Sequence, residues 1–129
     1  MEKETPPHPT DAELAILGVL WRDGPCTVRQ VYERLKASRA TGYTTALKLM
    51  QIMTEKGLVF RNESERTHVY RAGVSEQQTQ RRLVRDLLER VFGGSAHKLV
   101  MQALQSKKSS PTELAEIRKL LGQSGKGLL

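Results

Sequence analysis

The sequence predicts a mainly α fold that contains one small β-hairpin. Three observations predict it: helical spacing of apolar residues in three segments before Gly57, an alternating segment directly after it, and renewed helical spacing from Ser75. Three helices followed by a hairpin are the element order of a winged helix-turn-helix, whose second motif helix enters the DNA major groove. We therefore expect a winged helix-turn-helix domain followed by a three-helix dimerisation region.

The first two expected helices each begin with a capping box, in which a threonine and a residue three positions later satisfy two free backbone amides. Thr10 and Glu13 start a helix over about residues 10–22, and the turn-forming segment DGP ends it. Thr27 and Gln30 start a second helix over about residues 27–37.

The third expected helix ends at about Lys56, with Gly57 placed as its C-terminal cap. Its apolar residues recur at helical spacing and predict one buried face, made of Ala46, Leu49, Met50 and Met53. The alternation in residues 58–72 predicts the hairpin, whose tip is the charged run NESE at residues 62–65.

These elements divide the chain into a flexible arm (1–9), a winged helix-turn-helix DNA-binding domain (10–74), a helical dimerisation domain (75–122) and a flexible tail (123–129). Ser110 and Glu113 are spaced as a further capping box. The three C-terminal helices can bury only a thin core alone, so we expect them to complete it in a homodimer. The residues expected at that interface are Leu83, Leu87, Leu88, Val91, Leu99, Val100, Leu104, Leu114, Ile117 and Leu120. The alternative is that these helices pack back onto the N-terminal domain.

The amino-acid composition limits the classes of function that the protein can have. The net charge of +7 and the pI near 9.9 weakly indicate a polyanionic partner. Cys26 is the single cysteine, which excludes an internal disulfide and a cysteine-based metal cluster. The N-terminal segment has no apolar core, and no apolar run approaches the roughly 18–20 residues that span a bilayer. We expect a cytoplasmic protein with no direct membrane insertion.

No residue pattern indicates catalysis. The three histidines, His8, His68 and His97, fall in different segments, and none stands beside a plausible nucleophile. A glycine-rich phosphate loop and an HExxH motif are absent from the sequence. We expect neither an enzyme nor a bound cofactor or metal.

DNA binding has more support in the sequence. The third helix would lie in the major groove, and rotation away from its buried face brings up the residues expected to read bases: Thr44, Thr45, Lys48 and Gln51. Residues expected to hold the DNA backbone surround it: Arg29, Arg39, Tyr43, Arg61, Arg66 and His68. Residues 22–71 contain ten Lys/Arg against five Asp/Glu, a net charge of +5. Glu63 and Glu65 argue against deep insertion of the hairpin tip into a minor groove.

Each of these assignments has an alternative. Thr44 or Thr45 would serve as the N-terminal cap of the helix, Tyr43 would pack under the hairpin, and Lys48 and Gln51 would form an ordinary solvated face. Leu47 and Ile52 flank the expected reading face, and being apolar they favour a second hypothesis, a winged-helix protein-interaction module. A third is a winged-helix regulator that responds to a small ligand.

Several motifs together resemble one family, the penicillinase repressors of BlaI/MecI type. These are LAILGVLW (14–21), YTTALKLMQIMTEKGLV (43–59), HVYRAGVSEQQ (68–78), VFGGSAHKLVMQAL (91–104) and SPTELAEIRKLL (110–121). The resemblance covers about residues 10–121. It implies a homodimeric repressor on a palindromic operator, with base contacts at Thr44, Thr45 and Lys48 and a backbone contact at Tyr43.

The same resemblance implies control of β-lactam-resistance genes and relief of repression by a membrane sensor metalloprotease that cleaves the dimerisation region. The chain departs from the family pattern at two places. It has Gln102-Ala103 where staphylococcal-type members are cut at an Asn-Phe bond. It also lacks the C-terminal cysteine cluster of the copper-responsive branch, which excludes copper sensing through thiolates.

Overall fold

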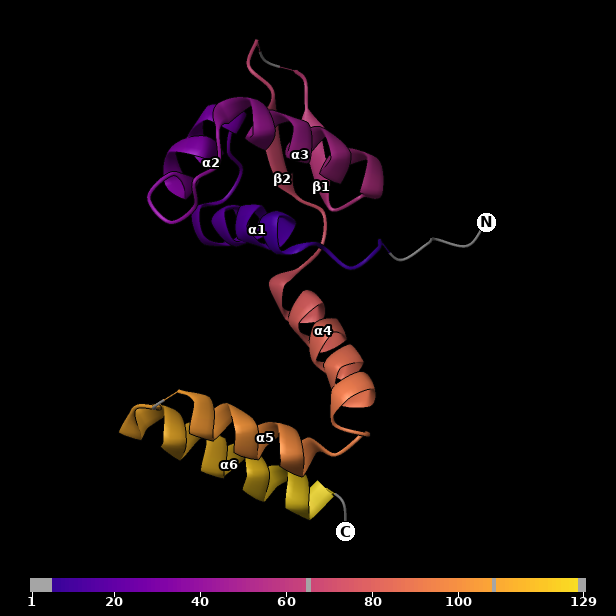
Figure 1. The fold of residues 1–129 in the computed structure, drawn as a ribbon, viewed down its shortest axis with the longest axis vertical. Coiled ribbons are helices and arrows are strands. Elements are labelled where there is room, and N and C mark those ends of the chain that lie inside the picture. The colour runs from indigo at the N-terminus through magenta and orange to yellow at the C-terminus, as the bar shows by residue number, and fades with distance from the viewer. Residues whose placement is uncertain (1–5, 65, 108, 128–129) are drawn as a thin grey trace. The chain divides into compact units, whose positions relative to one another are not determined.

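The computed structural model describes residues 6–64, 66–107 and 109–127, with side chains through residue 122 (Figure 1). Within these residues the elements are α1 (Asp11–Asp23), α2 (Val28–Leu35), α3 (Tyr43–Lys56), β1 (Val59–Asn62), β2 (Val69–Ala72), α4 (Glu76–Val91), α5 (Ala96–Ser106) and α6 (Pro111–Gly127). This order confirms the expected fold class, three helices and a hairpin followed by three further helices.

The chain divides into two compact units between Leu83 and Val84, within α4. We call them the first unit and the second unit. The division lies nine residues beyond the boundary expected at residue 74, because the beginning of α4 belongs to the first unit. Helix α6 also continues to Gly127, past residue 123 where a tail was expected. A glycine inside a helix is about 1 kcal/mol less favourable than an alanine, but α6 nevertheless continues through Gly122.

Capping explains where the helices of the first unit begin. The Thr10 side chain accepts a hydrogen bond from the Glu13 amide while the Glu13 side chain accepts one from the Thr10 amide, and Thr27 and Gln30 repeat this arrangement at α2. Both expected capping boxes are therefore present. Gly57 ends α3 with a φ of +80°, in the left-handed region that favours glycine, as expected from the sequence.

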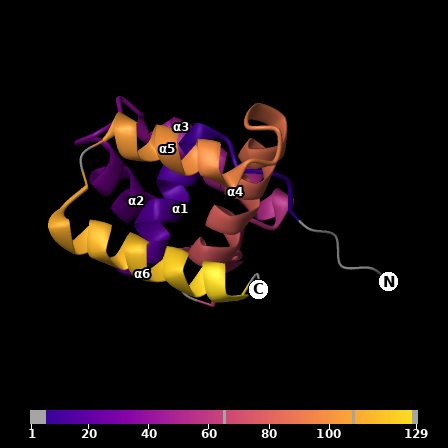
Figure 2. The ribbon, with the colours of Figure 1, turned by 90° about the horizontal axis from the view of Figure 1, so that it is seen from below.

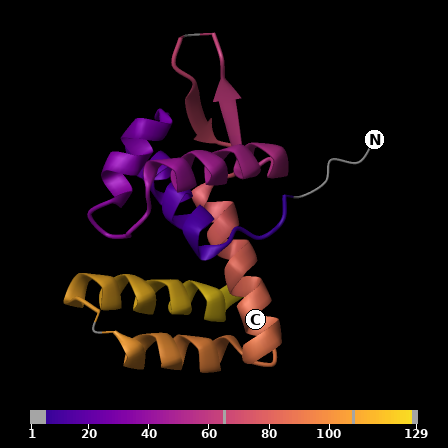
Figure 3. The same cartoon turned by 45° about the horizontal axis from the view of Figure 1, so that its top comes forward.

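The hairpin is an antiparallel pair in which Val59 lies opposite Ala72 and Asn62 opposite Val69 (Figure 3). A further bridge joins Tyr70 to Cys26, through reciprocal backbone hydrogen bonds of 2.8 and 2.9 Å. This bridge ties β2 to the segment between α1 and α2. Gly73 follows β2, and a Cβ there would lie 2.7 Å from the Gly57 carbonyl oxygen, so only glycine permits this close approach.

The core of the first unit joins all three N-terminal helices to the hairpin. It contains Ile16, Leu17, Val19, Leu20, Cys26, Val28, Val31, Leu35, Ala46, Met50, Met53, Leu58, Val59 and Tyr70. One carboxylate is buried with them: Glu13 is 1% exposed, and it accepts a 2.8 Å hydrogen bond from Lys56 Nζ. The indole nitrogen of Trp21 donates to the Val74 carbonyl at 2.9 Å, which fixes the exit from the hairpin against α1.

One described residue of the expected N-terminal arm, Pro6, contacts other parts of the first unit. The Pro6 carbonyl accepts a hydrogen bond from Arg82 on α4, and the Pro6 ring lies 3.7 Å from where a Cβ at Gly57 would be. Residues 1–5 of the arm lie outside the described part of the chain.

The second unit is built differently. Helices α5 and α6 run as two separate, roughly antiparallel helices, and α6 begins with the expected capping box of Ser110 and Glu113 (Figure 2). Among its described side chains, from Val84 to Gly122, none is buried. No helix in the described part of the chain is long and apolar enough to cross a membrane.

Candidate nucleic-acid interface

Helix α3 has one buried face and one exposed polar face. Ala46, Met50 and Met53 are fully buried, and Leu49 packs against the same core. The four residues expected to read bases, Thr44, Thr45, Lys48 and Gln51, are all exposed. The buried stripe therefore fixes the rotation of the helix so that these four side chains are accessible to a ligand.

The start of α3 leaves both threonine hydroxyls available. Its N-cap is Gly42, with no side-chain hydrogen bond at the cap, so neither Thr44 nor Thr45 fills that role. Neither hydroxyl has a hydrogen-bond partner among the described residues. The amides of the first turn are likewise free of a capping side chain, and such amides are a suitable binding site for phosphate.

Tyr43 is held by α2 rather than packed under the hairpin. Its ring meets the Tyr32 ring edge-on, with centroids 5.9 Å apart, and the Arg29 guanidinium lies 5.4 Å from the Tyr43 ring centroid. The side chain remains 40% exposed. An aromatic pair and a cation–π contact thus orient a residue at the very start of α3 while leaving it accessible.

A groove of about 630 Å³ separates the start of α3 from the hairpin. Its lining comes from three elements and includes Thr27, Val28, Arg29, Gln30, Tyr43, Leu47, Arg66, Thr67, His68 and Tyr70. Four of the six residues expected to hold the DNA backbone therefore converge on it, namely Arg29, Tyr43, Arg66 and His68. The sequence did not single out Thr27, Gln30 and Thr67 for this surface, because only the fold brings them there.

The two other expected backbone residues lie elsewhere. Arg39 is exposed in the connection between α2 and α3. Arg61 lies on β1, where it forms an ion pair with Glu63, and a hydrogen bond with Tyr70 raises the pKa of its guanidinium. Glu63 thus neutralises a cation of the hairpin itself, whereas Glu65 lies outside the described residues.

The two apolar residues beside the reading face are both partly buried. Leu47 packs against the core of the first unit and also lines the groove. Ile52 is half-buried, and nothing in the structure explains its choice. Neither forms an exposed apolar patch, so the feature that favoured a protein-interaction module is weaker in the structure than in the sequence.

The residues expected at the dimer interface are at least partly accessible in the single chain. Leu83, Leu88, Leu99, Val100, Leu104 and Ile117 are half-buried. Leu87, Val91, Leu114 and Leu120 are exposed, Val91 by 63% and Leu120 by 61%. Exposed apolar side chains mark an interaction surface where they form a contiguous patch, whereas single exposed ones are ordinary.

A row of charged residues on α2 completes the electrostatics of this face. Glu33 forms ion pairs with Arg29, at 3.8 Å, and with Lys36, at 2.6 Å. The Lys36 ammonium in turn lies 5.7 Å from the Tyr32 ring centroid. Glu33 and Lys36 were not expected at this surface, although their i,i+4 and i,i+3 spacings from Arg29 and from each other are visible in the sequence.

Comparison with known proteins gives relatives along nearly the whole chain. A family model described as penicillinase repressor matches residues 9–123. Transcriptional regulator BlaI of Mycobacterium tuberculosis is 43% identical over 61 residues, which cover 46% of this chain and 44% of that protein. The match thus spans less than half of that relative. The penicillinase repressor of Bacillus licheniformis is 22% identical over 115 residues, covering 89% of this chain and 90% of that protein.

A solved structure shares the fold. The solution structure of the DNA binding domain of the repressor BlaI superposes with a TM-score of 0.51 at 22% identity, over 57% of this chain and 90% of that domain. This confirms the winged-helix fold expected from the sequence. Because the family model covers residues 9–123, far more than half of the chain, the chain belongs to the penicillinase repressor family of transcriptional repressors.

Proposed function

We propose that this protein is a dimeric, sequence-specific DNA-binding repressor. In this proposal α3 enters the major groove of a two-fold symmetric operator, with Thr44, Thr45, Lys48 and Gln51 toward the base edges. The groove beside the hairpin receives the DNA backbone. The solution structure of the Bacillus licheniformis BlaI monomeric form in complex with the blaP half-operator, a structural neighbour with a TM-score of 0.50, supports this class of ligand.

The observation that carries the proposal is the accessible polar row at the start of α3. Threonine hydroxyls donate and accept hydrogen bonds, and the threonine methyl can meet a thymine methyl. Lysine can address guanine, and glutamine adenine. Because Gly42 rather than a threonine caps the helix, the two threonine hydroxyls make no hydrogen bond within the described residues.

The charges around the row fit backbone contacts. Arg29, Arg66 and His68 line one groove with the Tyr43 phenol. Each phosphate that a cation neutralises releases condensed counterions. For each such phosphate, the logarithm of the binding constant falls by about 0.9 for every tenfold rise in salt concentration. We expect binding to the operator with a Kd of the order of 10⁻⁸–10⁻¹¹ M, strongly dependent on salt.

Dimerisation is the second part of the proposal. A two-fold symmetric operator requires two copies of α3, and the accessible apolar side chains of α4, α5 and α6 offer a surface for a second copy. In the single chain none of the described side chains between Val84 and Gly122 is fully buried, so a partner would supply the missing core.

The regulated genes and the inducing signal form the third part. The names of the relatives, penicillinase repressor and methicillin resistance regulatory protein MecI, support control of β-lactam-resistance-type genes. Relief by a sensor protease needs a cleavage site other than an Asn-Phe bond. Gln102 and Ala103 stand at that position and are exposed within α5.

The decisive experiment is selection of binding sites from a random duplex library, followed by binding titrations of the selected duplex and a scrambled one. We expect a two-fold symmetric site with tight binding. Lys48→Ala and Thr45→Ala should each lower discrimination by about 1–3 kcal/mol per lost base contact. Equal and weak binding to every duplex, or variants that discriminate as well as wild type, would refute the proposal and favour the interaction module.

A further inference from the structure

Five side chains on α2 and at the start of α3 form one continuous network. Glu33 lies at the centre, with Arg29 four residues before it and Lys36 three residues after it on the same side of α2. Each cation also lies over a tyrosine ring, Arg29 over Tyr43 and Lys36 over Tyr32. The two rings meet edge-on, which closes the network between the two helices.

The carboxylate at the centre keeps its charge at neutral pH. The hydrogen bond from Lys36 is the largest influence on the Glu33 carboxyl and lowers its pKa, although partial desolvation opposes it. Glu33 therefore neutralises cations that lie beside the groove proposed for the DNA backbone. Arg29, one of those cations, lines the groove directly.

The negative charge of Glu33 weakens the electrostatic attraction between this surface and DNA. It lies next to phosphate-binding cations, and it repels phosphates within a Debye length of about 10 Å at 0.1 M salt. A surface evolved only for affinity would not place an acid there. For helix stability the two pairs differ: the Arg29–Glu33 pair has the cation before the acid, the less favourable orientation, whereas the Glu33–Lys36 pair has the acid first.

We propose that Glu33 is a specificity-determining residue, which restrains Arg29 and Lys36 so that they hold phosphates well only in the geometry of the operator complex. This inference rests on the proposed function. Non-specific binding derives essentially all of its affinity from phosphate contacts made in many registers. Cationic side chains that are free to move can make more of these contacts. In the operator complex the base contacts fix the register, and Arg29 already lies where the Tyr43 ring holds it.

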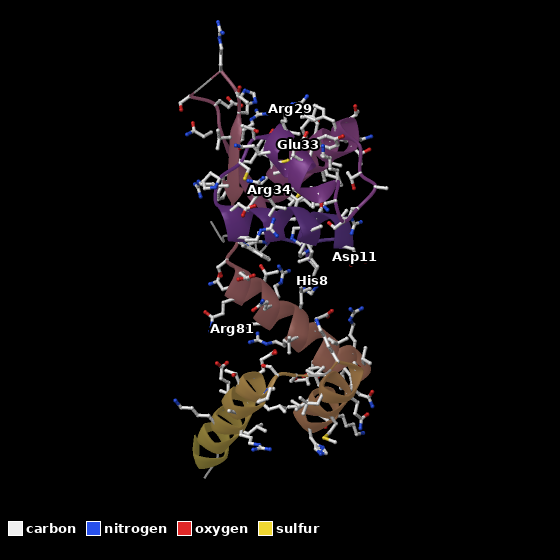
Figure 4. The ribbon with its side chains drawn as sticks, turned by 90° about the vertical axis from the view of Figure 1, so that its left-hand side faces the viewer. His8, Asp11, Arg29, Glu33, Arg34 and Arg81 are labelled. Atoms are coloured by element: carbon white, nitrogen blue, oxygen red, sulfur yellow. The ribbon has the colours of Figure 1, made fainter. Side chains whose placement is uncertain are left out.

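The test compares two variants that each remove one negative charge from the first unit. Glu33→Gln breaks the network, whereas Asp11→Asn changes a residue in the first turn of α1, outside the network. Figure 4 shows Arg29 and Glu33 close together and Asp11 well apart from both. Binding to the selected operator and to a scrambled duplex is titrated for each protein between 0.05 and 0.5 M salt, a range of about one decade.

We expect Glu33→Gln to bind the scrambled duplex several-fold more tightly. One additional phosphate contact raises the binding constant at 0.1 M salt by about eight-fold relative to 1 M salt. It also makes the slope of log binding constant against log salt steeper by about 0.9. Operator binding should change less, so the ratio of the two affinities falls. Asp11→Asn should leave that ratio at the wild-type value.

Two results would overturn the inference: an unchanged ratio in Glu33→Gln, or a fall of the same size in Asp11→Asn, which would be an effect of net charge alone. A purely structural role would lower the urea midpoint and weaken both duplexes together, without a steeper salt dependence. Failure of the proposed function is distinguishable, because the wild-type protein would then not discriminate between the duplexes at all.

Discussion

The buried ion pair between Glu13 and Lys56 gives the sharpest test of what stabilises the first unit. Burial by itself raises the pKa of Glu13, but hydrogen bonds from Lys56 and the Thr10 amide, with the Lys56 charge, outweigh it and keep the pKa below 4.5. Lys56→Met removes the cation and leaves the carboxylate at a site that is 1% exposed. The change should therefore destabilise the fold at neutral pH.

The expected magnitude follows from the surroundings of the pair. Removing one partner of a fully buried pair costs about 3–5 kcal/mol. Here the Lys56 side chain is 31% exposed, and the Thr10 amide still donates to the carboxylate at 2.8 Å, so water and this amide recover part of the loss. We expect about 2 kcal/mol, which lowers the urea midpoint by about 1 M for a slope near 2 kcal/mol/M.

The assay is urea unfolding followed by the fluorescence of Trp21, the single tryptophan, which is hydrogen-bonded within the first unit. All proteins are compared at one concentration, because dimerisation would shift the midpoints. The matched control is Lys36→Met, which removes a lysine from an exposed pair with Glu33 and should shift the midpoint far less.

The pH dependence of the stability difference provides the result that would refute this account of the Glu13–Lys56 pair. A carboxyl whose pKa is lower in the folded state contributes stability above its unfolded pKa, and this contribution is lost as the pH falls through its folded pKa. The gap between wild type and Lys56→Met should therefore be full at pH 7 and narrow in acid, as the Glu13 carboxyl becomes protonated. Equal midpoints at pH 7, or a gap that persists unchanged in acid, would show that the pair does not carry this stability.

Three further predictions concern binding, the turn after α3, and assembly. Lys48→Ala should reduce discrimination between operator and scrambled duplex, whereas Arg66→Ala should weaken both about equally and reduce the salt slope by about 0.9; binding titrations separate the two. Gly57→Ala, at a φ of +80°, should lower the unfolding free energy by about 1 kcal/mol in urea titrations, and an unchanged midpoint would contradict the cap assignment. Leu87→Lys, on an exposed apolar position, should shift the protein toward monomer in sedimentation velocity, and an unaltered oligomeric state would remove α4 from the interface.

Local chemistry made much of the fold predictable. The capping boxes at Thr10, Thr27 and Ser110, and the left-handed cap at Gly57, depend on neighbours within four residues, and all are present as expected. The apolar periodicity of α3 likewise predicted which side is buried, and hence that Lys48 is exposed.

Long-range contacts could not be predicted from local sequence patterns. The bridge from Cys26 to Tyr70 and the pair of Glu13 with Lys56 join residues more than forty positions apart, and no local pattern specifies such partners. The groove beside the hairpin has the same origin, because its lining comes from segments that only the fold brings together. The course of α6 through Gly127 shows the converse limit, in which a glycine-rich composition was a poor guide to where the helix ends.

Gly42 has a consequence for attempts to engineer this protein. Its φ of −76° and ψ of 164° suit any residue, and a Cβ there would have no atom within 4 Å. Serine or asparagine would thus fit and would gain a few tenths of a kcal/mol as a helix cap. The new side-chain oxygen would, however, occupy the amides that the proposed complex leaves for phosphate. A design scheme that rewards thermal stability alone would select this change and lose DNA affinity, a trade-off between stability and activity located at a single backbone position.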